Sequence, residues 1–176
     1  MTAAAVPLQS FIRDIEDFPK PGITFKDITP LLADPAALAS AVHQLSQPFA
    51  ELGITKVVGM EARGFIFAAP VAVALGAGFV PVRKAGKLPW AVNRQEYQLE
   101  YGTDLLEIHQ DAISAGDRVL IIDDVLATGG TADATVQLLA QSGAEVVALG
   151  FVIELEFLGG RAPLGEAAIT TLVRYA

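Results

Sequence analysis

The segment 119–132 combines residue types that could bind a phosphorylated sugar. An apolar run ends in the paired carboxylates Asp123 and Asp124, and a short loop then leads into a helical pattern. The loop consists of Ala127, Thr128, Gly129, Gly130 and Thr131. Its glycines let the backbone approach a ligand, and the free N–H groups and dipole of a following helix favour a phosphate. Carboxylates repel phosphate but accept hydrogen bonds from ribose hydroxyls. The segment therefore predicts a ribose 5-phosphate site.

Two plainer interpretations of this segment stay open. The loop could be an ordinary strand-to-helix turn in which Thr131 caps the helix. The paired aspartates, Asp123 and Asp124, could instead hold a metal ion directly. A P-loop is excluded, because no G-x-x-x-x-G-K-S/T pattern occurs anywhere in the chain.

Two further segments place cations beside glycine-containing turns. Arg63 stands in the sequence GMEARGF, between an apolar run and an apolar helical pattern, where its forked guanidinium suits a diphosphate. Arg83, Lys84 and Lys87 surround Gly86 and precede a polar stretch. A cationic loop of this kind can close over an anionic substrate and exclude water. Taken alone, a surface arginine and a solvated hairpin would explain the same residues.

The elements that must position these residues alternate between short apolar runs and helix-length segments. We expect helices over 35–52, 65–75 and 131–142, strands over 56–60, 79–82, 118–124, 144–153 and 168–175, and a strand pair within 96–108. Asp34 can cap the first helix, with Pro35 at its first position. Apolar runs separated by helices indicate a mostly parallel, twisted sheet with helices on both faces. The sequence thus predicts one α/β domain, with a core over 34–176 and an N-terminal arm or hood over 1–33.

The composition excludes several classes of site and partner. The chain has no cysteine, which rules out a disulfide framework and a thiol-ligated metal site and fits a cytoplasmic setting. Its formal net charge of −8 argues against a nucleic-acid partner. Residues 64–82 carry no charge and could suggest a membrane span, but Pro70, Gly76 and Pro81 interrupt them. We therefore expect a buried helix and strand there, no secretory signal at the N-terminus, and no membrane partner.

Four segments, in order, resemble type I phosphoribosyltransferases. They read FPKPGITFKDITPLL at 18–32, GMEARGF at 59–65, RKAGKLP through YQLEYGTD at 83–104, and VLIIDDVLATGGTA at 119–132. The resemblance implies the fold of that family, with the first segment as a hood over a purine. It also implies that Asp123 and Asp124 hold the ribose hydroxyls, that loop 127–131 holds the 5-phosphate, and that Arg63 holds the diphosphate. A cis peptide between Glu61 and Ala62 is implied as well.

The third segment is similar to the adenine-specific branch of the family in particular. From that branch, Lys84 is expected on the diphosphate, and Arg83 is expected there too or at the site of a partner subunit. Glu100 and Tyr101 are expected beside the reacting centre, with Glu100 as the catalytic residue that manages a purine proton. The residues expected around adenine are Thr24, Phe25, Lys26 and Leu155. The family often has arginine where Lys26 stands, which puts a stacking role for that side chain in doubt.

The resemblance implies a purine salvage reaction in which adenine and phosphoribosyl diphosphate form AMP and diphosphate. Magnesium is then expected to be carried by the substrate, without a direct protein ligand, and the chain is expected to form a homodimer. Two alternatives remain open. One is a phosphoribosyltransferase for another base, such as hypoxanthine or xanthine. The other is a regulatory protein that binds phosphoribosyl diphosphate without turnover, against which the acidic balance argues because such proteins carry a nucleic-acid surface.

Overall fold

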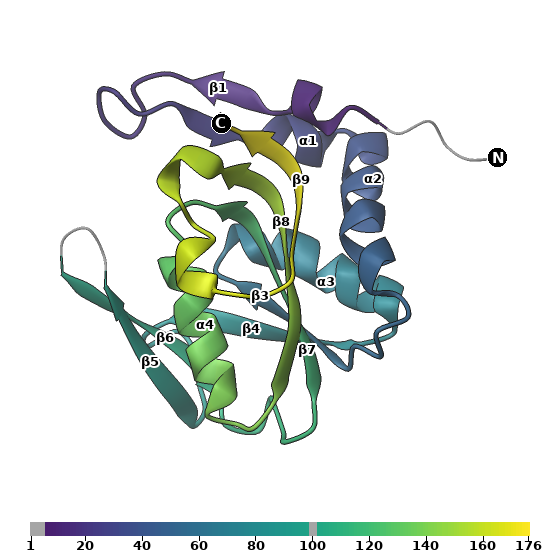
Figure 1. Ribbon diagram of the computed structural model, residues 1–176, viewed down its shortest axis with the longest axis vertical. Helices are drawn as coiled ribbons and strands as arrows, with labels where there is room; N and C mark the ends of the chain where they lie inside the picture. The colour runs from purple at the N-terminus through teal and green to yellow at the C-terminus, as the bar shows by residue number, and fades with distance from the viewer. Residues whose placement is uncertain (1–5, 99–101) are drawn as a thin grey trace.

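A seven-stranded sheet in the order β5-β6-β4-β3-β7-β8-β9 forms the centre of the protein (Figure 1). The computed structural model describes residues 6–98 and 102–176. The strands are β3 (Lys56–Met60), β4 (Gly78–Lys84), β5 (Val92–Gln98), β6 (Thr103–His109), β7 (Arg118–Leu126), β8 (Glu145–Leu155) and β9 (Ile169–Tyr175). β3, β4, β7, β8 and β9 run parallel, whereas β5 and β6 add an antiparallel hairpin at one edge. The mostly parallel sheet predicted from the sequence is confirmed.

Helices cover both faces of this sheet and explain why its central strands are apolar throughout (Figure 1). α2 (Pro35–Ser46) and α3 (Arg63–Leu75) pack on one face, and α4 (Gly130–Ala140) packs on the other. Along β7 the side chains alternate between the two cores, with Leu120 and Ile122 in the first and Ile121 in the second. Burying a side chain of this size contributes about 1.5–3 kcal/mol, so β7 anchors both layers.

The start of α2 agrees with the prediction from the sequence, but its end does not. The Asp34 carboxylate accepts hydrogen bonds from the backbone N–H groups of Ala36 at 2.9 Å and Ala37 at 2.8 Å, so the predicted cap is confirmed. The predicted helix over 35–52 was too long, because α2 ends at Ser46 and a 3-10 turn, η2 (Gln47–Phe49), follows. Pro48 explains the change, since it has no N–H for the next helical hydrogen bond. No helix in the described parts of the chain is long and apolar enough to cross a membrane.

The N-terminal segment forms a small separate sheet over one end of the core (Figure 1). It contains η1 (Leu8–Phe11), β1 (Arg13–Ile15), β2 (Phe25–Asp27) and α1 (Thr29–Ala33), and β1 pairs antiparallel with β2. Lys26 of β2 places its Nζ atom 3.9 Å from the centre of the Tyr175 ring in β9. This contact ties the N-terminal sheet to the last strand of the core.

The order of the central strands creates a crevice for a ligand. β3 leads through α3 to β4 on one side, and β7 leads through α4 to β8 on the other. Because β3 and β7 are neighbours, the two connections leave in opposite directions and open a space beyond the carboxyl ends of these strands. Open α/β sheets bind ligands at such a point. It is also where Asp123, Asp124 and Arg63 lie.

Candidate active site

The loop after β7 encloses a small cavity of about 70 Å³. Loop residues 127–131 line it together with Met60, Asp123 and Phe151. Gly129 has φ +83°, a left-handed conformation that glycine adopts without strain, and α4 begins at the next residue. Within the described chain, no side chain caps the first turn of α4, so the interpretation of Thr131 as a helix cap is wrong. The first N–H groups of α4 are therefore available to an anion.

The shape of the loop depends on Gly129 within it and on Gly160 outside it. A Cβ atom on Gly129 would lie 2.2 Å from the backbone oxygen of Gly160, and one on Gly160 would lie 2.3 Å from the backbone oxygen of Ala127. The loop thus packs backbone against backbone on the turn that follows β8. Sequence reasoning missed Gly160, because its partner lies 33 residues away in the chain (127 to 160).

The paired aspartates lie at the mouth of this loop with different surroundings. Asp124 is buried and forms an ion pair with Arg63 of α3. Asp123 accepts the backbone N–H of Asp124 at 2.8 Å. Burial, and after it the negative charge of Asp124, raises the pKa of Asp123 well above its ordinary value. Two hydroxyl donors, such as those of a ribose, would relieve this unfavourable pairing.

Gly64, at the start of α3, determines where Asp123 can sit. A Cβ atom on Gly64 would lie 2.6 Å from the Asp123 Oδ1 atom and 3.1 Å from the backbone oxygen of Ile122. Helix α3 therefore approaches the end of β7 so closely that only glycine fits. The motif around Arg63 contains Gly64, but its sequence shows no sign of this contact because β7 is far along the chain.

A larger cavity of about 470 Å³ adjoins the phosphate-sized one and shares Asp123, Ala127 and Thr131 with it. It brings together most of the site residues expected from the sequence. Its lining includes Thr24, Phe25, Lys26, Glu61, Arg63, Lys84, Tyr97, Asp123, Asp124 and Leu155. Phe25 is half-buried and borders this cavity. The Arg63 guanidinium lies 5.3 Å from the centre of that ring.

Lys26 borders the cavity, but its ammonium group is occupied elsewhere. Its Nζ atom donates to the Asp14 carboxylate at 2.7 Å and lies over the Tyr175 ring. A stacking role for this side chain on a base is therefore not supported by the geometry. Lys26, with Thr24 and Phe25, nevertheless lines the larger cavity.

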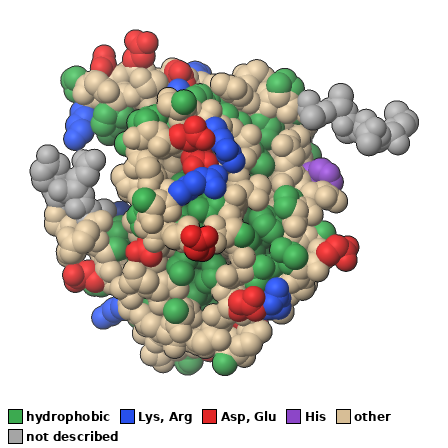
Figure 2. Space-filling model, in the orientation of Figure 1, with side chains coloured by type: hydrophobic (Ala, Val, Ile, Leu, Met, Phe, Trp, Pro, Cys, Tyr) green, Lys and Arg blue, Asp and Glu red, His purple; other side chains and the backbone are tan. Residues whose placement is uncertain are grey.

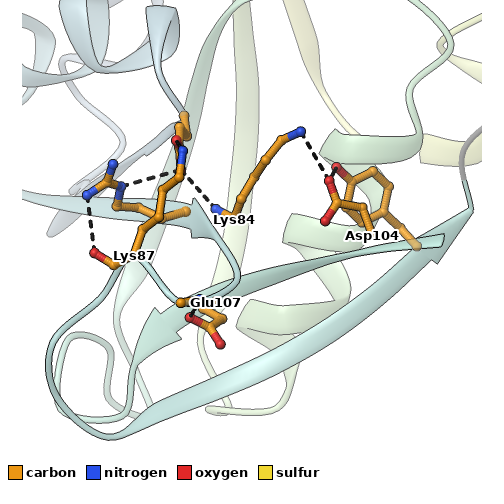
Figure 3. A network of polar contacts seen from close by, with 8 residues as sticks. Lys84, Lys87, Asp104 and Glu107 are labelled. Carbon is orange, nitrogen blue, oxygen red and sulfur yellow. Dashed lines mark hydrogen bonds and ion pairs between the residues drawn. The ribbon is translucent and has the colours of Figure 1, made fainter.

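Figure 3 shows the cationic segment 83–87, which begins at the end of β4, and the carboxylates around it. The Lys84 side chain extends towards Asp104 of β6, with 3.1 Å between Nζ and Oδ2, and Tyr97 donates to the same carboxylate at 3.3 Å. The hydrogen bond with Asp104 raises the pKa of Lys84, so this cation is fully charged at neutral pH. Sequence reasoning named Lys84 but missed Tyr97 and Asp104, which help to hold it beside the cavity.

Two carboxylates fix the backbone of the same segment: the half-buried Glu61 and the buried Glu107, which Figure 3 labels. Glu61 accepts the backbone N–H of Lys84 at 2.9 Å, and Glu107 accepts that of Gly86 at 2.9 Å. Burial disfavours ionisation of Glu61, but hydrogen bonds from the Lys87 side chain, the Lys84 backbone and Arg83 together lower its pKa. The segment is thus held in one conformation from both sides. The cis peptide expected between Glu61 and Ala62 is confirmed.

One described residue that was expected at the site, Arg83, is not brought into the cavity. Arg83 donates to the Glu61 carboxylate at 3.4 Å and to the backbone oxygen of Lys87 at 3.2 Å, and it does not line the cavity of its own chain. Glu100 and Tyr101 lie outside the described residues. In the described part of the chain, no cluster of three or more potential ligands could hold a metal ion.

The surface carries no feature of a nucleic-acid-binding face on the side viewed in Figure 2. Lys and Arg side chains lie beside Asp and Glu there and do not form a continuous basic patch. Ion pairs such as Arg118 with Glu145 and Arg161 with Glu154 illustrate this mixing. The cations among the described residues that line the larger cavity are Lys26, Arg63 and Lys84.

Comparison with known proteins identifies the family. The phosphoribosyl transferase domain matches residues 24–157. The adenine phosphoribosyltransferase of Acaryochloris marina is 60% identical over 168 residues, which cover 96% of this chain and 99% of that protein. The crystal structure of adenine phosphoribosyltransferase from Rhodothermus marinus is 54% identical, covers 96% of both chains and has a TM-score of 0.91.

A second structural relative carries ligands. The adenine phosphoribosyltransferase of Saccharomyces cerevisiae, crystallised with an imino-altritol bisphosphate and adenine, is 43% identical and has a TM-score of 0.89. The likeness covers 94% of this chain and 96% of that one. This chain therefore belongs to the adenine phosphoribosyltransferases and has the type I phosphoribosyltransferase fold.

Proposed function

We propose that this protein transfers the phosphoribosyl group of 5-phosphoribosyl 1-diphosphate to adenine, forming AMP and diphosphate in purine salvage. One observation carries the proposal: a small cavity in loop 127–131 shares Asp123 with a larger cavity that Asp124 and the hood residues 23–26 also line. Phosphate, ribose and base follow one another in AMP in the same order. The close relatives named above support the same reaction.

In this assignment each part of the substrate has its own residues. The 5-phosphate binds the N–H groups and hydroxyls of loop 127–131, and the ribose hydroxyls donate to Asp123 and Asp124. Adenine lies under the hood between the 24–26 backbone and Leu155. The diphosphate binds Arg63 and Lys84, and Arg63 must then leave the Asp124 carboxylate that it pairs with in the free protein. Arg83 is assigned to the diphosphate of a partner subunit's site.

The reaction exchanges one bond at C1′ of the ribose. The bond from C1′ to the diphosphate oxygen breaks, N9 of adenine forms the new bond, and the proton of N9 leaves the base. The cations Arg63 and Lys84 stabilise the leaving anion. We assign Glu100 to the transfer of the purine proton, through N7, because the segment YQLEYGTD at 97–104 resembles that of the adenine-specific branch of the family.

Magnesium would enter this site bound to the substrate and not to protein ligands. Three carboxylates line the larger cavity, but Glu61 already accepts three donors, and Asp123 and Asp124 are assigned to the ribose hydroxyls. No carboxylate is then left for a protein cage, whereas Mg²⁺ commonly binds through phosphate oxygens and water. When bound, the ion neutralises charge on the diphosphate as it leaves.

We propose further that the chain consists of a hood over 1–33 and a core over 34–176, and that it forms a homodimer. An apolar patch on α3 and β4 supports the dimer, with Ile66 41%, Val73 82% and Phe79 37% exposed. Ile66 and Val73 are seven residues apart and share one face of α3. Light scattering should give twice the mass of 18.5 kDa, and Val73→Glu should give the monomer mass. We also assign the protein to the cytoplasm, where its lack of cysteine fits the reducing conditions.

A panel of bases tests the proposed function. The protein, phosphoribosyl diphosphate and Mg²⁺ are incubated with adenine, hypoxanthine, guanine or xanthine, and nucleotide and diphosphate are measured together. We expect AMP and diphosphate in equal amounts from adenine and at least tenfold lower kcat/KM for the other bases, about 1.4 kcal/mol or more in transition-state binding. Equal rates with hypoxanthine or guanine would contradict adenine specificity, and no product from any base would favour a regulatory binding protein.

A further inference from the structure

The turn after β8 supports the phosphate loop from behind. This turn is defined by residues 156–161 and includes η3 (Glu156–Leu158). Gly129 and Gly160 meet so closely that a Cβ atom on Gly129 would lie 2.2 Å from the Gly160 oxygen. A Cβ atom on Gly160 would in turn lie 2.3 Å from the Ala127 oxygen. A shift of the turn must therefore shift loop 127–131, because neither backbone has room to move independently.

A buried carboxylate fixes this turn to the sheet. Glu154, near the end of β8, has a side chain that is only 5% exposed. Its two oxygens accept from Arg161, with 2.6 Å to Nε and 2.7 Å to an NH2 nitrogen, in the two-point geometry that holds a guanidinium in one orientation. Thr171 of β9 donates to the same carboxylate at 3.0 Å. Arg161 directly follows Gly160, so the pair restrains the residue that touches the loop.

The groups around Glu154 favour the ionised form of its side chain. Hydrogen bonds from Arg161 lower the pKa of Glu154 more than burial raises it. Leu164, three residues beyond Arg161, is buried in the same core as Leu126 and Ala132, which flank the phosphate loop. The ion pair from Glu154 to Arg161 thus spans the turn, and the buried Leu164 packs in the core just after it.

From this geometry we infer that Arg161 and Glu154 are positioning residues for the 5-phosphate loop. Neither lines the two cavities of the candidate active site. They act through Gly160, which keeps the N–H groups of loop 127–131 aimed at the phosphate. The inference rests on the proposed function, since it assumes that this loop binds the 5-phosphate.

The chain offers a matched control for Arg161. Arg174 of β9 approaches the same carboxylate, with 3.6 Å between its Nε and the Glu154 Oε2, and it also donates to Thr171. Its side chain is 55% exposed, against 42% for Arg161. Arg174 lies outside the turn that touches the loop, and it approaches that turn through an exposed ion pair with Glu156 at 3.7 Å. Arg161→Gln and Arg174→Gln therefore remove the same charge from the same carboxylate, but only the first removes the two-point contact beside Gly160.

The test compares the binding of AMP and adenosine, which differ only in the phosphate, by calorimetry on the full chain. We expect Arg161→Gln to weaken AMP binding about tenfold and leave adenosine binding unchanged, because small misplacements of aligned groups have effects of this size or larger. Arg174→Gln should leave both affinities within about twofold of the wild type, as expected for an exposed charge pair. Gly160→Ala should act like Arg161→Gln, and Arg161→Lys, which keeps the charge but not the two-point contact, should be intermediate.

The outcomes separate this inference from the function on which it rests. If the wild-type protein binds adenosine as tightly as AMP, the assignment of the phosphate loop itself is wrong. If the wild type prefers AMP and Arg161→Gln keeps that preference in full, the positioning role is wrong. Equal losses for AMP and adenosine, or equal losses in the Arg161 and Arg174 variants, would show a general structural effect and would also overturn the inference.

Discussion

Replacing Gly64 with alanine should damage the ribose site much more than the fold. The new Cβ atom would lie 2.6 Å from the Asp123 Oδ1 atom, whereas ordinary contacts begin at 3.4 Å. The carboxylate or the start of α3 must therefore move by roughly 0.8 Å. The backbone oxygen of Ile122, at 3.1 Å, blocks part of the way out. The displaced group is the one that we assign to the ribose hydroxyls.

The expected magnitudes differ for stability and activity. Overpacking costs about 1–3 kcal/mol, and alanine regains about 1 kcal/mol over glycine within a helix. The net loss is then at most about 2 kcal/mol, or a Tm decrease of no more than about 8 °C for a chain of this length. A misplacement approaching 1 Å in the site can lower the rate about a hundredfold, so we expect kcat/KM for phosphoribosyl diphosphate to fall at least tenfold.

Steady-state kinetics and thermal unfolding check this prediction together. The matched control is Gly78→Ala, because a Cβ there meets only the flexible end of Lys56, at 3.3 Å. That variant should keep wild-type kinetics. If Gly64→Ala kept wild-type kcat/KM while the protein remained folded, the reasoning from the close approach of α3 to Asp123 would be refuted.

Three further substitutions test the assigned residues. Folding raises the pKa of Asp123, so its ionised form destabilises the folded state at pH values above the unfolded pKa, and Asp123→Asn should raise the Tm of the free protein. The same variant should bind phosphoribosyl diphosphate at least tenfold more weakly, because it loses a charge-assisted bond of about 1.5–3 kcal/mol. A lower Tm in thermal unfolding together with tighter binding in calorimetry would contradict the ribose role. Glu107→Gln places an amide N–H₂ group against a former donor, either Arg94 or the backbone of Gly86. This variant should raise KM for phosphoribosyl diphosphate about threefold or more with little change in kcat. An unchanged KM would show that Glu107 does not hold the cationic segment for the substrate. Glu100→Gln should lower kcat at least tenfold with unchanged phosphoribosyl diphosphate affinity, and wild-type turnover would leave the reaction without its acid.

The sequence predicted the central strands and the phosphate loop well, because their signals are local. The run 118–124 is apolar on both faces, and β7 indeed lies between two cores. Asp34 and Pro35 stand next to the helix that they begin. The carboxylates, glycines and threonines of the loop follow β7 directly, so the order of the chain already places them together.

Contacts between distant segments could not be read from the sequence. Gly64 looked like part of the Arg63 motif, although its reason for being glycine is Asp123 on another strand. Glu107 lies in a strand that looked ordinary, yet it accepts the N–H of Gly86 from the turn after β4. The chain gave no local sign that Gly160 would touch the phosphate loop. Each of these depends on how strands are ordered in the sheet, which periodicity does not specify.

A crystal structure with AMP tests the central claim most directly, that the two adjoining cavities hold one nucleotide. The account predicts the phosphate against the N–H groups of loop 127–131, the ribose hydroxyls within hydrogen-bond distance of Asp123 and Asp124, and adenine between Phe25 and Leu155. An AMP molecule bound with its base in the loop, or bound elsewhere on the protein, would contradict the account.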